Sequence, residues 1–248
     1  MTATQNKITQ AMILAAGLGT RLKPWTDLHP KALAPVNGQP LLRRNIRYLQ
    51  QFGIYEVVVN VHHFAGQITD AIEAGKGWGS RIIVSDETNE VLETGGGLQK
   101  AAPLFRQGDF VLMNVDILTD LNLFDMIGQH RQQAPLATLA VRNRDTSRYF
   151  LFDDRDQLCG WRNVKTAEQI LVRNVQTPIQ KAFSGIHIVN TRLFPLLQRT
   201  GKFSMVDAYL DLAAGNSIQA FDHSASRFID VGTPASVVQA QEIFKDEL

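Results

Sequence analysis

The sequence contains a single cysteine, Cys159, among its 248 residues. An internal disulfide is therefore impossible, and no cluster of thiolates is available for a structural zinc site. The sequence also lacks any uninterrupted apolar run as long as a membrane helix requires. Its first ten residues are polar and lack the apolar core of a signal peptide. These absences predict a cytoplasmic protein with no membrane partner.

An excess of charge of one sign is also missing. Lysine and arginine number 25, aspartate and glutamate number 24, and the formal net charge is +1. No strong field of one sign would draw the chain onto a nucleic acid or an anionic membrane, so any phosphate binding must be local. Apolar residues make up 44% of the chain, enough for a substantial core, and the length fits one domain over residues 1–248.

The last four residues spell Lys-Asp-Glu-Leu, the retention signal of the endoplasmic reticulum. That signal is recognised only in the secretory lumen, and nothing in the sequence predicts delivery there. We interpret the four residues as the charged end of a last helix that begins at Ala235.

Strand-like and helix-like segments alternate, which predicts an α/β fold with a largely parallel sheet covered by helices on both faces. The predicted strands are 11–16, 56–61, 81–85, 109–115, 135–141, 149–152, 158–161 and 183–189. The predicted helices are 40–52, 65–73, one after Gly97, 121–132, one opening at Ser204, and 235–245. The shorter strands beyond residue 121 indicate antiparallel additions to the sheet.

The most informative segment follows the first predicted strand and contains Gly17-Leu-Gly19-Thr-Arg21, with Pro30-Lys31 downstream. Two glycines after a buried strand let the backbone turn tightly and bring its N–H groups close to a ligand. Arg21 is able to bind phosphate oxygens in bidentate fashion, and Lys31 adds a mobile point charge.

Two other glycine motifs do not fit this segment. A dinucleotide-binding fingerprint requires a third glycine at position 22, where the sequence has leucine, and this disfavours an NAD-dependent dehydrogenase. A P-loop requires Gly-Lys followed by Ser or Thr, and that triplet is absent.

The run from Gly17 through Lys31 to Val36 resembles the signature loop of the sugar-1-phosphate nucleotidyltransferases. That family has a Rossmann-like fold related to the GT-A glycosyltransferases, with a mixed, mostly parallel central sheet, and the resemblance spans about residues 10–245. It implies a nucleotide-binding half at about 10–120 and a sugar-binding half at about 121–248. The nucleotide-binding loop residues that it implies are Ala15, Ala16, Gly17, Gly19, Thr20 and Arg21.

Two aspartates at the ends of predicted strands, Asp116 and Asp230, offer the hard oxygen ligands that Mg²⁺ prefers. The resemblance implies that both bind the metal, with Asp230 in an Asp-x-Gly-Thr segment. The family commonly has glycine before the first aspartate, where this chain has Val115, and the larger side chain could alter how closely the backbone approaches the nucleotide. Asp120, close by, is predicted to cap the following helix.

Three consecutive glycines, Gly95, Gly96 and Gly97, would let a flat base lie against the backbone. The resemblance implies that they line a base pocket and that Glu93 and Thr94 beside them contact the sugar. It also implies a sugar contact at Ser184 and Gly185. A second cation should meet the sugar phosphate, and the candidates are Lys165, which we prefer, and Lys181.

The resemblance implies nucleotidyl transfer from a nucleoside triphosphate to a sugar 1-phosphate, with Arg21, Lys31 and Asp116 as catalytic residues and Mg²⁺ as cofactor. The segments around Glu93 and Ser184 look like those of N-acetylmuramate 1-phosphate uridylyltransferases, which serve the cell wall, and of short mannose-1-phosphate guanylyltransferases. Larger relatives continue into a left-handed β-helix, and here we expect one activity from a monomer or homodimer. The alternative of another class is a non-catalytic nucleotide-sugar sensor.

Overall fold

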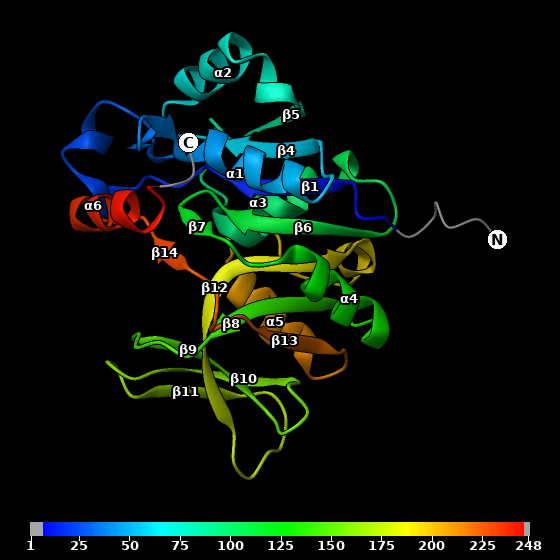
Figure 1. Ribbon diagram of the computed structural model, residues 1–248. Coiled ribbons are helices and arrows are strands. Elements are labelled where there is room, and N and C mark those ends of the chain that lie inside the picture. The colour runs from blue at the N-terminus through cyan, green and yellow to red at the C-terminus, as the bar shows by residue number, and fades with distance from the viewer. Residues whose placement is uncertain (1–6, 246–248) are drawn as a thin grey trace.

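The computed structural model describes residues 7–245. The polar segment before residue 7 lies outside the described residues, as does the C-terminal Lys-Asp-Glu-Leu apart from Lys245. A ten-stranded mixed sheet forms the centre, in the order β11-β10-β9-β12-β6-β1-β4-β5, with β8 and β13 joined at β12 (Figure 1). The α/β fold with helices on both faces of a mixed sheet is confirmed.

The first half of the chain forms the parallel part of this sheet, β5-β4-β1-β6. These strands span Gln10–Leu14 (β1), Glu56–Val61 (β4), Arg81–Asp86 (β5) and Asp109–Asn114 (β6). Along β1, Met12 packs into the hydrophobic cluster on one face and Ile13 into the cluster on the other. An unbroken apolar strand is expected where helices cover both faces of a sheet, since each face then needs a buried side chain.

The second half extends the sheet with mostly antiparallel strands. They are β8 (Ala137–Arg142), β9 (Arg148–Phe152), β10 (Leu158–Asn163), β11 (Glu168–Leu171), β12 (Ile179–Asn190) and β13 (Ile218–Asp222). The long β12 pairs with β6, β8 and β9 and so joins the extension to the parallel part. Only β13 runs parallel to its neighbour, β8.

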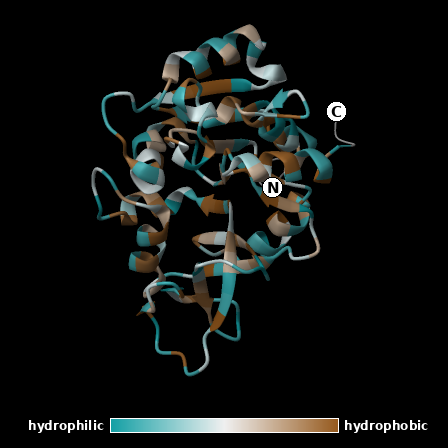
Figure 2. Cartoon of the chain, turned by 90° about the vertical axis from the view of Figure 1, so that its left-hand side faces the viewer, coloured by the Kyte–Doolittle hydropathy of each residue, from teal (hydrophilic) through white to brown (hydrophobic). Residues whose placement is uncertain are grey.

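Six α-helices flank the strands of the described chain. They are α1 (Leu41–Gln51), α2 (Ala65–Ala74), α3 (Glu93–Ala101), α4 (Leu123–Gln133), α5 (Met205–Ala213) and α6 (Pro234–Ile243). The helix predicted over 40–52 is confirmed, and Gly53 follows its end with a φ of 75°. The capping box predicted at Ser204 is also confirmed, with Asp207 as its acidic partner. Hydrophobic residues concentrate on strands and on inward helix faces, whereas outer turns are largely hydrophilic (Figure 2).

Two predictions about helix starts are wrong. The helix predicted after Gly97 begins at Glu93, so the three glycines lie within its first two turns. Asp120 does not cap α4, because Asn122 accepts the capping bond from the Phe124 N–H. Asp120 instead forms an ion pair with Arg227 at 2.7 Å.

Two short ribbons lie off the main sheet. One joins β2 (Pro35–Val36) to β3 (Gln39–Pro40), and the other joins β7 (Ile117–Thr119) to β14 (Phe228–Asp230) in antiparallel register. The second ribbon places β14, near the C-terminal end of the described residues, beside β7, the strand that directly follows β6. Within residues 7–245, no helix is long and apolar enough to cross a bilayer.

Candidate active site

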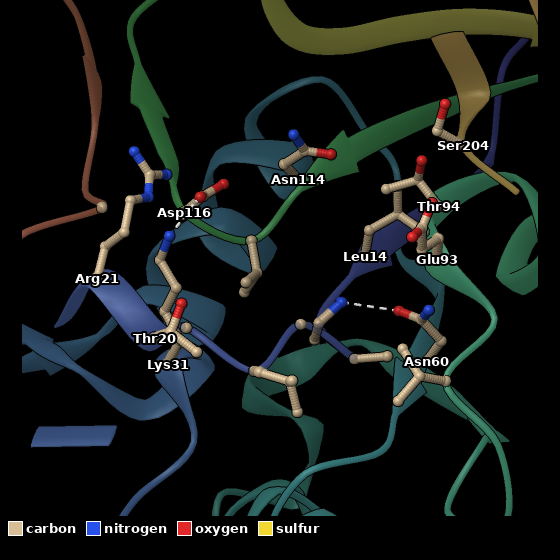
Figure 3. Close-up of a pocket in the computed structure, with 18 of the residues that line it drawn as sticks. Leu14, Thr20, Arg21, Lys31, Asn60, Glu93, Thr94, Asn114, Asp116 and Ser204 are labelled. Atoms are coloured by element: carbon tan, nitrogen blue, oxygen red, sulfur yellow. Dashed lines mark hydrogen bonds and ion pairs between the residues drawn. The ribbon is translucent and has the colours of Figure 1, made fainter. Parts of the chain in front are cut away.

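A cavity of ≈ 560 Å³ opens where β1, β4 and β6 end. This is the edge of an open α/β sheet at which ligands bind. The predicted loop residues Ala15, Ala16, Gly17, Gly19, Thr20 and Arg21 all line it, as do Lys31, Asp116, Glu93 and Thr94. Figure 3 shows Arg21, Lys31 and Asp116 together at one end of the cavity and Glu93, Thr94 and Ser204 at the other.

The turn of the glycine loop requires Gly19. Its φ is 62°, and a Cβ there would lie 2.9 Å from both Lys31 Cβ and Thr26 Cγ2. The Thr26 hydroxyl donates to the Gly19 carbonyl at 3.0 Å, which holds the turn. A side chain at position 19 would therefore push Lys31 away from the cavity, so this glycine sets the position of a cation.

The two predicted metal aspartates are brought together by the β7–β14 ribbon. Asp116 lies in the turn after β6 rather than within the strand, and Asp230 is the last residue of β14. Asp230 pairs with Ile117 across the ribbon, and the Val231 N–H donates to the Asp116 carbonyl at 2.8 Å. Residues more than a hundred positions apart are thus fixed side by side through the backbone.

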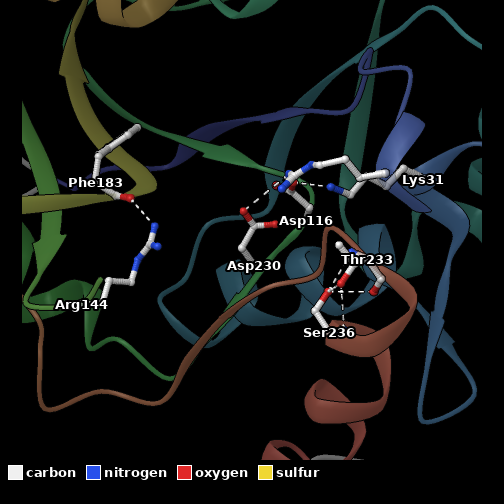
Figure 4. A network of polar contacts seen from close by, with 8 residues as sticks. Lys31, Asp116, Arg144, Phe183, Asp230, Thr233 and Ser236 are labelled. Atoms are coloured by element: carbon white, nitrogen blue, oxygen red, sulfur yellow. Dashed lines mark hydrogen bonds and ion pairs between the residues drawn. The ribbon is translucent and has the colours of Figure 1, made fainter. Parts of the chain in front are cut away.

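Each of these carboxylates meets one of the predicted loop cations. Lys31 Nζ forms an ion pair with Asp116, and both side chains are largely buried. Arg21 lies 3.8 Å from Asp230 in a more exposed pair. Figure 4 shows Lys31, Asp116 and Asp230 close to one another.

The surroundings of the Asp230 carboxylate leave one of its oxygens available for a cation. Its Oδ1 is buried with no hydrogen-bond partner among the described residues. Burial raises the pKa of Asp230, and the nearby negative charge of Asp116 raises it further. The described residues contain no cluster of three or more His, Cys, Asp or Glu, so the protein offers two carboxylates. That donor set fits a divalent cation that takes its remaining ligands from substrate phosphates and water.

The three glycines of α3 lie outside the cavity lining and are packed against other parts of the chain. The N–H groups of Gly95 and Gly96 both donate to the Phe203 carbonyl, so they are not available to a base. A Cβ at Gly96 would lie 2.1 Å from the Gly201 carbonyl oxygen, and one at Gly95 would meet the Phe203 ring at 2.4 Å. The small size of Gly95 and Gly96 allows α3 to pack closely on the loop before α5, whereas the base-pocket role stays a prediction.

Glu93 and Thr94, at the start of α3, do reach the cavity. Glu93 has a φ of 59° and lies 3.6 Å from Lys202 in an ion pair. The Thr94 hydroxyl accepts from the Met205 N–H at 2.9 Å, which ties α3 to α5. This end of the cavity is therefore built from two helix starts, with Ser204 as the cap of α5.

The predicted sugar residues of the second half lie outside the cavity lining. Ser184 is buried, and its hydroxyl lies 2.7 Å from His223 Nε2. Gly185, at a bulge in β12 with a φ of 72°, packs against Asn114, where a Cβ would be 2.8 Å from Nδ2. Lys165 is exposed in the turn between β10 and β11, and Lys181 is engaged with Asp156 at 2.7 Å.

Several cavity residues were missed by sequence reasoning. Asn60 lies one residue before the end of β4 and Asn114 ends β6, and both pair with Leu14 in the sheet register. Polar residues at the carboxyl ends of apolar strands are a signal that could have identified them. Lys202 and Ser204 come from the loop before α5, and no local pattern placed that loop here.

Arg144 lies outside the cavity lining and was not among the predicted site residues either. It lies between β8 and β9 and donates to the Phe183 carbonyl at 3.2 Å (Figure 4). Its guanidinium also lies over the Phe228 ring. Burial lowers the pKa of this guanidinium, and the nearby Asp230 carboxylate opposes that shift. Arg144 is thus a half-buried cation of the second half whose field reaches a predicted metal ligand.

A model of the nucleotidyl transferase family matches residues 10–156, more than half of the sequence. The chain belongs to the nucleotidyl transferase family. The match covers the parallel strands, the glycine loop, Lys31 and Asp116. Asp230 and α6 lie beyond it.

Curated relatives and a solved structure extend this result. N-acetylmuramate alpha-1-phosphate uridylyltransferase of Neisseria meningitidis is 42% identical over 113 residues, 46% of this chain and 49% of the relative. The alignment thus spans about half the length of that relative. A mannose-1-phosphate guanyltransferase of Yarrowia lipolytica is 23% identical over 243 residues, 96% of this chain and 65% of the relative. HddC from Yersinia pseudotuberculosis, solved with GMP-PN, shares the fold with a TM-score of 0.78 at 23% identity, over 96% of this chain and 100% of that one.

Proposed function

We propose that this chain transfers a nucleotidyl group from a nucleoside triphosphate to a sugar 1-phosphate and releases pyrophosphate. The observation that carries the proposal is the meeting of Arg21, Lys31, Asp116 and Asp230 at the glycine loop. Two cations suit a polyphosphate, and two adjacent carboxylates suit the cation that accompanies it. Family membership agrees with this chemistry.

The reaction is an in-line displacement at the α-phosphorus. An oxygen of the sugar 1-phosphate forms the new P–O bond, and the bond to the pyrophosphate oxygen breaks. The attacking phosphate is already anionic at neutral pH, so no general base is required. Rate enhancement then comes from positioning and from neutralising the charge on the phosphates.

Arg21 and Lys31 exchange partners when the triphosphate enters. Each leaves its carboxylate for phosphate oxygens, and Asp116 and Asp230 are then free to bind Mg²⁺. Bound there, Mg²⁺ would supply Lewis-acid stabilisation of the phosphate charge. Before the substrate binds, the two ion pairs hold all four side chains close to the positions that the substrate needs.

We propose Arg144 as the cation that meets the sugar phosphate. It is the second-half cation whose charge acts on Asp230, and its Nε is buried without a partner among the described residues. Lys165, the residue preferred from sequence, is exposed in a distant turn. A half-buried guanidinium whose charge acts on Asp230 is the better placed of the two for a phosphate.

For the substrates we propose UTP and N-acetylmuramate 1-phosphate. The support is the 42% identity over 113 residues to the uridylyltransferase of Neisseria meningitidis. The second candidate is GTP with mannose 1-phosphate, which the similarity to the Yarrowia lipolytica enzyme over 96% of this chain favours. We further propose that the protein acts in the cytoplasm.

A pyrophosphate-release assay with Mg²⁺ tests the reaction and both substrate pairs. UTP, GTP, CTP and dTTP are each combined with N-acetylmuramate 1-phosphate and with mannose 1-phosphate. We expect the fastest release with UTP and N-acetylmuramate 1-phosphate. Tight nucleotide binding without release in any combination would instead support a non-catalytic sensor.

A further inference from the structure

A buried hydrogen-bonded pair, Asn60 and Glu87, lies against the start of the glycine loop, and Asn60 also lines the cavity. Neither residue has a role in the reaction described above. The Ala15 N–H, the first of the loop, donates to Asn60 Oδ1 at 2.7 Å. Asn60 Nδ2 in turn donates to Glu87 Oε1 at 2.8 Å. Asn60 is 2% exposed and Glu87 is 1% exposed. Figure 3 shows the Asn60 amide turned toward the loop backbone.

The carboxylate of Glu87 decides which way the Asn60 amide points. A carboxylate accepts hydrogen bonds and donates none, so only the NH₂ group of Asn60 is able to face it. The amide oxygen must then face the Ala15 N–H. Burial of this charge is costly and raises the pKa of Glu87, a shift that the Asn60 amide, the nearby charge of Lys100 and the Leu92 backbone oppose.

The surrounding backbone is arranged around this pair. The Glu87 N–H donates to the Val61 carbonyl at 2.8 Å, and His62 Nδ1 lies 2.7 Å from the Glu87 carbonyl. Gly97 leaves the space that the pair occupies, because a Cβ there would lie 2.6 Å from Glu87 Oε1 and 2.9 Å from Asn60 Nδ2. Three elements, β4, the end of β5 and α3, thus converge on the two side chains.

We propose that Glu87 and Asn60 are positioning residues that orient the first amide of the glycine loop and so preset the loop for the triphosphate. This inference rests on the proposed function for the identity of the ligand. Glu87 acts through Asn60, which acts through the Ala15 backbone. The chain of bonds runs from a buried charge to the wall of the cavity.

A donor–acceptor exchange tests the pair. Asn60→Asp keeps an acceptor for Ala15 but places a second carboxylate against Glu87. Adding Glu87→Gln restores a donor between the two positions at the net charge of the wild type. In calorimetric titrations of the full chain with Mg²⁺ and UTP, we expect Asn60→Asp to weaken binding about tenfold or more. The double variant should recover to within about threefold of wild type.

A second readout needs no nucleotide. Hydrogen exchange of the Ala15 amide should be about tenfold faster in Asn60→Asp and in the uncharged Asn60→Ala, and should slow again in the double variant. The exchange measurement tests the link from Glu87 through Asn60 to the Ala15 amide even if no triphosphate binds. Absence of triphosphate binding would contradict the proposed function, whereas the exchange rates would still show whether the pair orients the loop.

Asn190→Asp is the matched control. Asn190 Nδ2 donates to Asp109 Oδ1 at 2.5 Å, an amide–carboxylate pair at the opposite end of β6. This variant should lower the thermal midpoint while UTP affinity and Ala15 exchange stay unchanged. The inference would be overturned if Asn60→Asp bound UTP as tightly as wild type with unchanged Ala15 exchange. It would also be overturned if the double variant recovered neither property.

Discussion

The two halves of the chain contribute differently to the cavity. The first half, residues 10–120, supplies the glycine loop, both loop cations and Asp116. The second half supplies Lys202, Ser204 and Gly232 to the lining and brings Asp230 in through the β7–β14 ribbon. The first half therefore supplies most of the lining, and the second half adds a smaller set that includes the charged Lys202. Ser184 and His223, also in the second half, are buried. Substitutions should divide accordingly between loss of activity and loss of stability.

The largest effect is expected from Asp116→Ala in the first half. Turnover should fall about 10²-fold or more, because a group placed to stabilise charge in the transition state is lost. Asp120→Ala is the control, since Asp120 pairs with Arg227 outside the cavity, and its turnover should stay within about threefold of wild type. Steady-state pyrophosphate release measures both. Near-normal Mg²⁺-dependent turnover in Asp116→Ala would contradict the proposal that the charged network takes part in the reaction.

Gly96→Ala should act on stability although it lies in the first half. The added Cβ would meet the Gly201 carbonyl, a backbone atom that is not free to move aside, so unfolding free energy should fall by about 1–3 kcal/mol. Gly66→Ala in α2 has open space around it and should gain about 0.5–1 kcal/mol. Urea unfolding compares the two. A Gly96→Ala protein of normal stability with altered preference among triphosphates would restore the base-pocket interpretation.

His223 should make the second half sensitive to acid. Burial lowers its pKa from 6.5 to about 4, and the charges of Arg142 and Arg144 nearby act in the same direction against those of Asp222 and Asp120. Below pH 6.5 the unfolded chain takes up a proton that the folded chain refuses until about pH 4, so stability falls as the pH drops between these values.

At pH 5 the contribution of His223 amounts to about 2 kcal/mol. Urea unfolding at pH 7 and pH 5 measures how much unfolding free energy each protein loses on acidification. His223→Gln should lose about 2 kcal/mol less than wild type. An identical loss in both proteins would mean that His223 is protonated as easily in the folded state as in the unfolded one.

The smallest expected effect is on the KM for the sugar 1-phosphate, and it should distinguish Arg144 from Lys165. Arg144→Ala should raise the KM for the sugar 1-phosphate about tenfold, roughly 1.4 kcal/mol, and leave the KM for UTP within about twofold. Lys165→Ala should change neither, because its side chain is exposed away from the cavity. A raised KM for the sugar 1-phosphate in Lys165→Ala, with no change in Arg144→Ala, would support the prediction from sequence that Lys165 meets the sugar phosphate.

Sequence reasoning succeeded where function depends on a local motif at the end of a parallel strand. The segment from Gly17 to Arg21 carries its own turn chemistry, and β4 was predicted at its observed limits, Glu56–Val61. Parallel strands bring their carboxyl ends to one edge, so the loop and Asp116 were placed together without any knowledge of register.

It failed where position depends on packing between distant segments. Gly95–Gly97 looked like an open loop, yet the backbone at Gly201 and Phe203 folds onto them and makes their size a packing requirement. The charge of Arg144 acts on Asp230. Arg144 follows β8, which joins the sheet by pairing with β12 across a bulge that no local pattern reveals. The bond from Asn60 to Glu87 links strands whose register is likewise set by the whole sheet.

A crystal structure with Mg²⁺ and a non-hydrolysable UTP analogue tests the central claim most directly. We predict the triphosphate against the backbone of Ala15–Arg21, with Arg21 and Lys31 on its oxygens and Asp116 and Asp230 released to a shared cation. A triphosphate bound elsewhere, with the Lys31–Asp116 and Arg21–Asp230 pairs intact, would contradict the account.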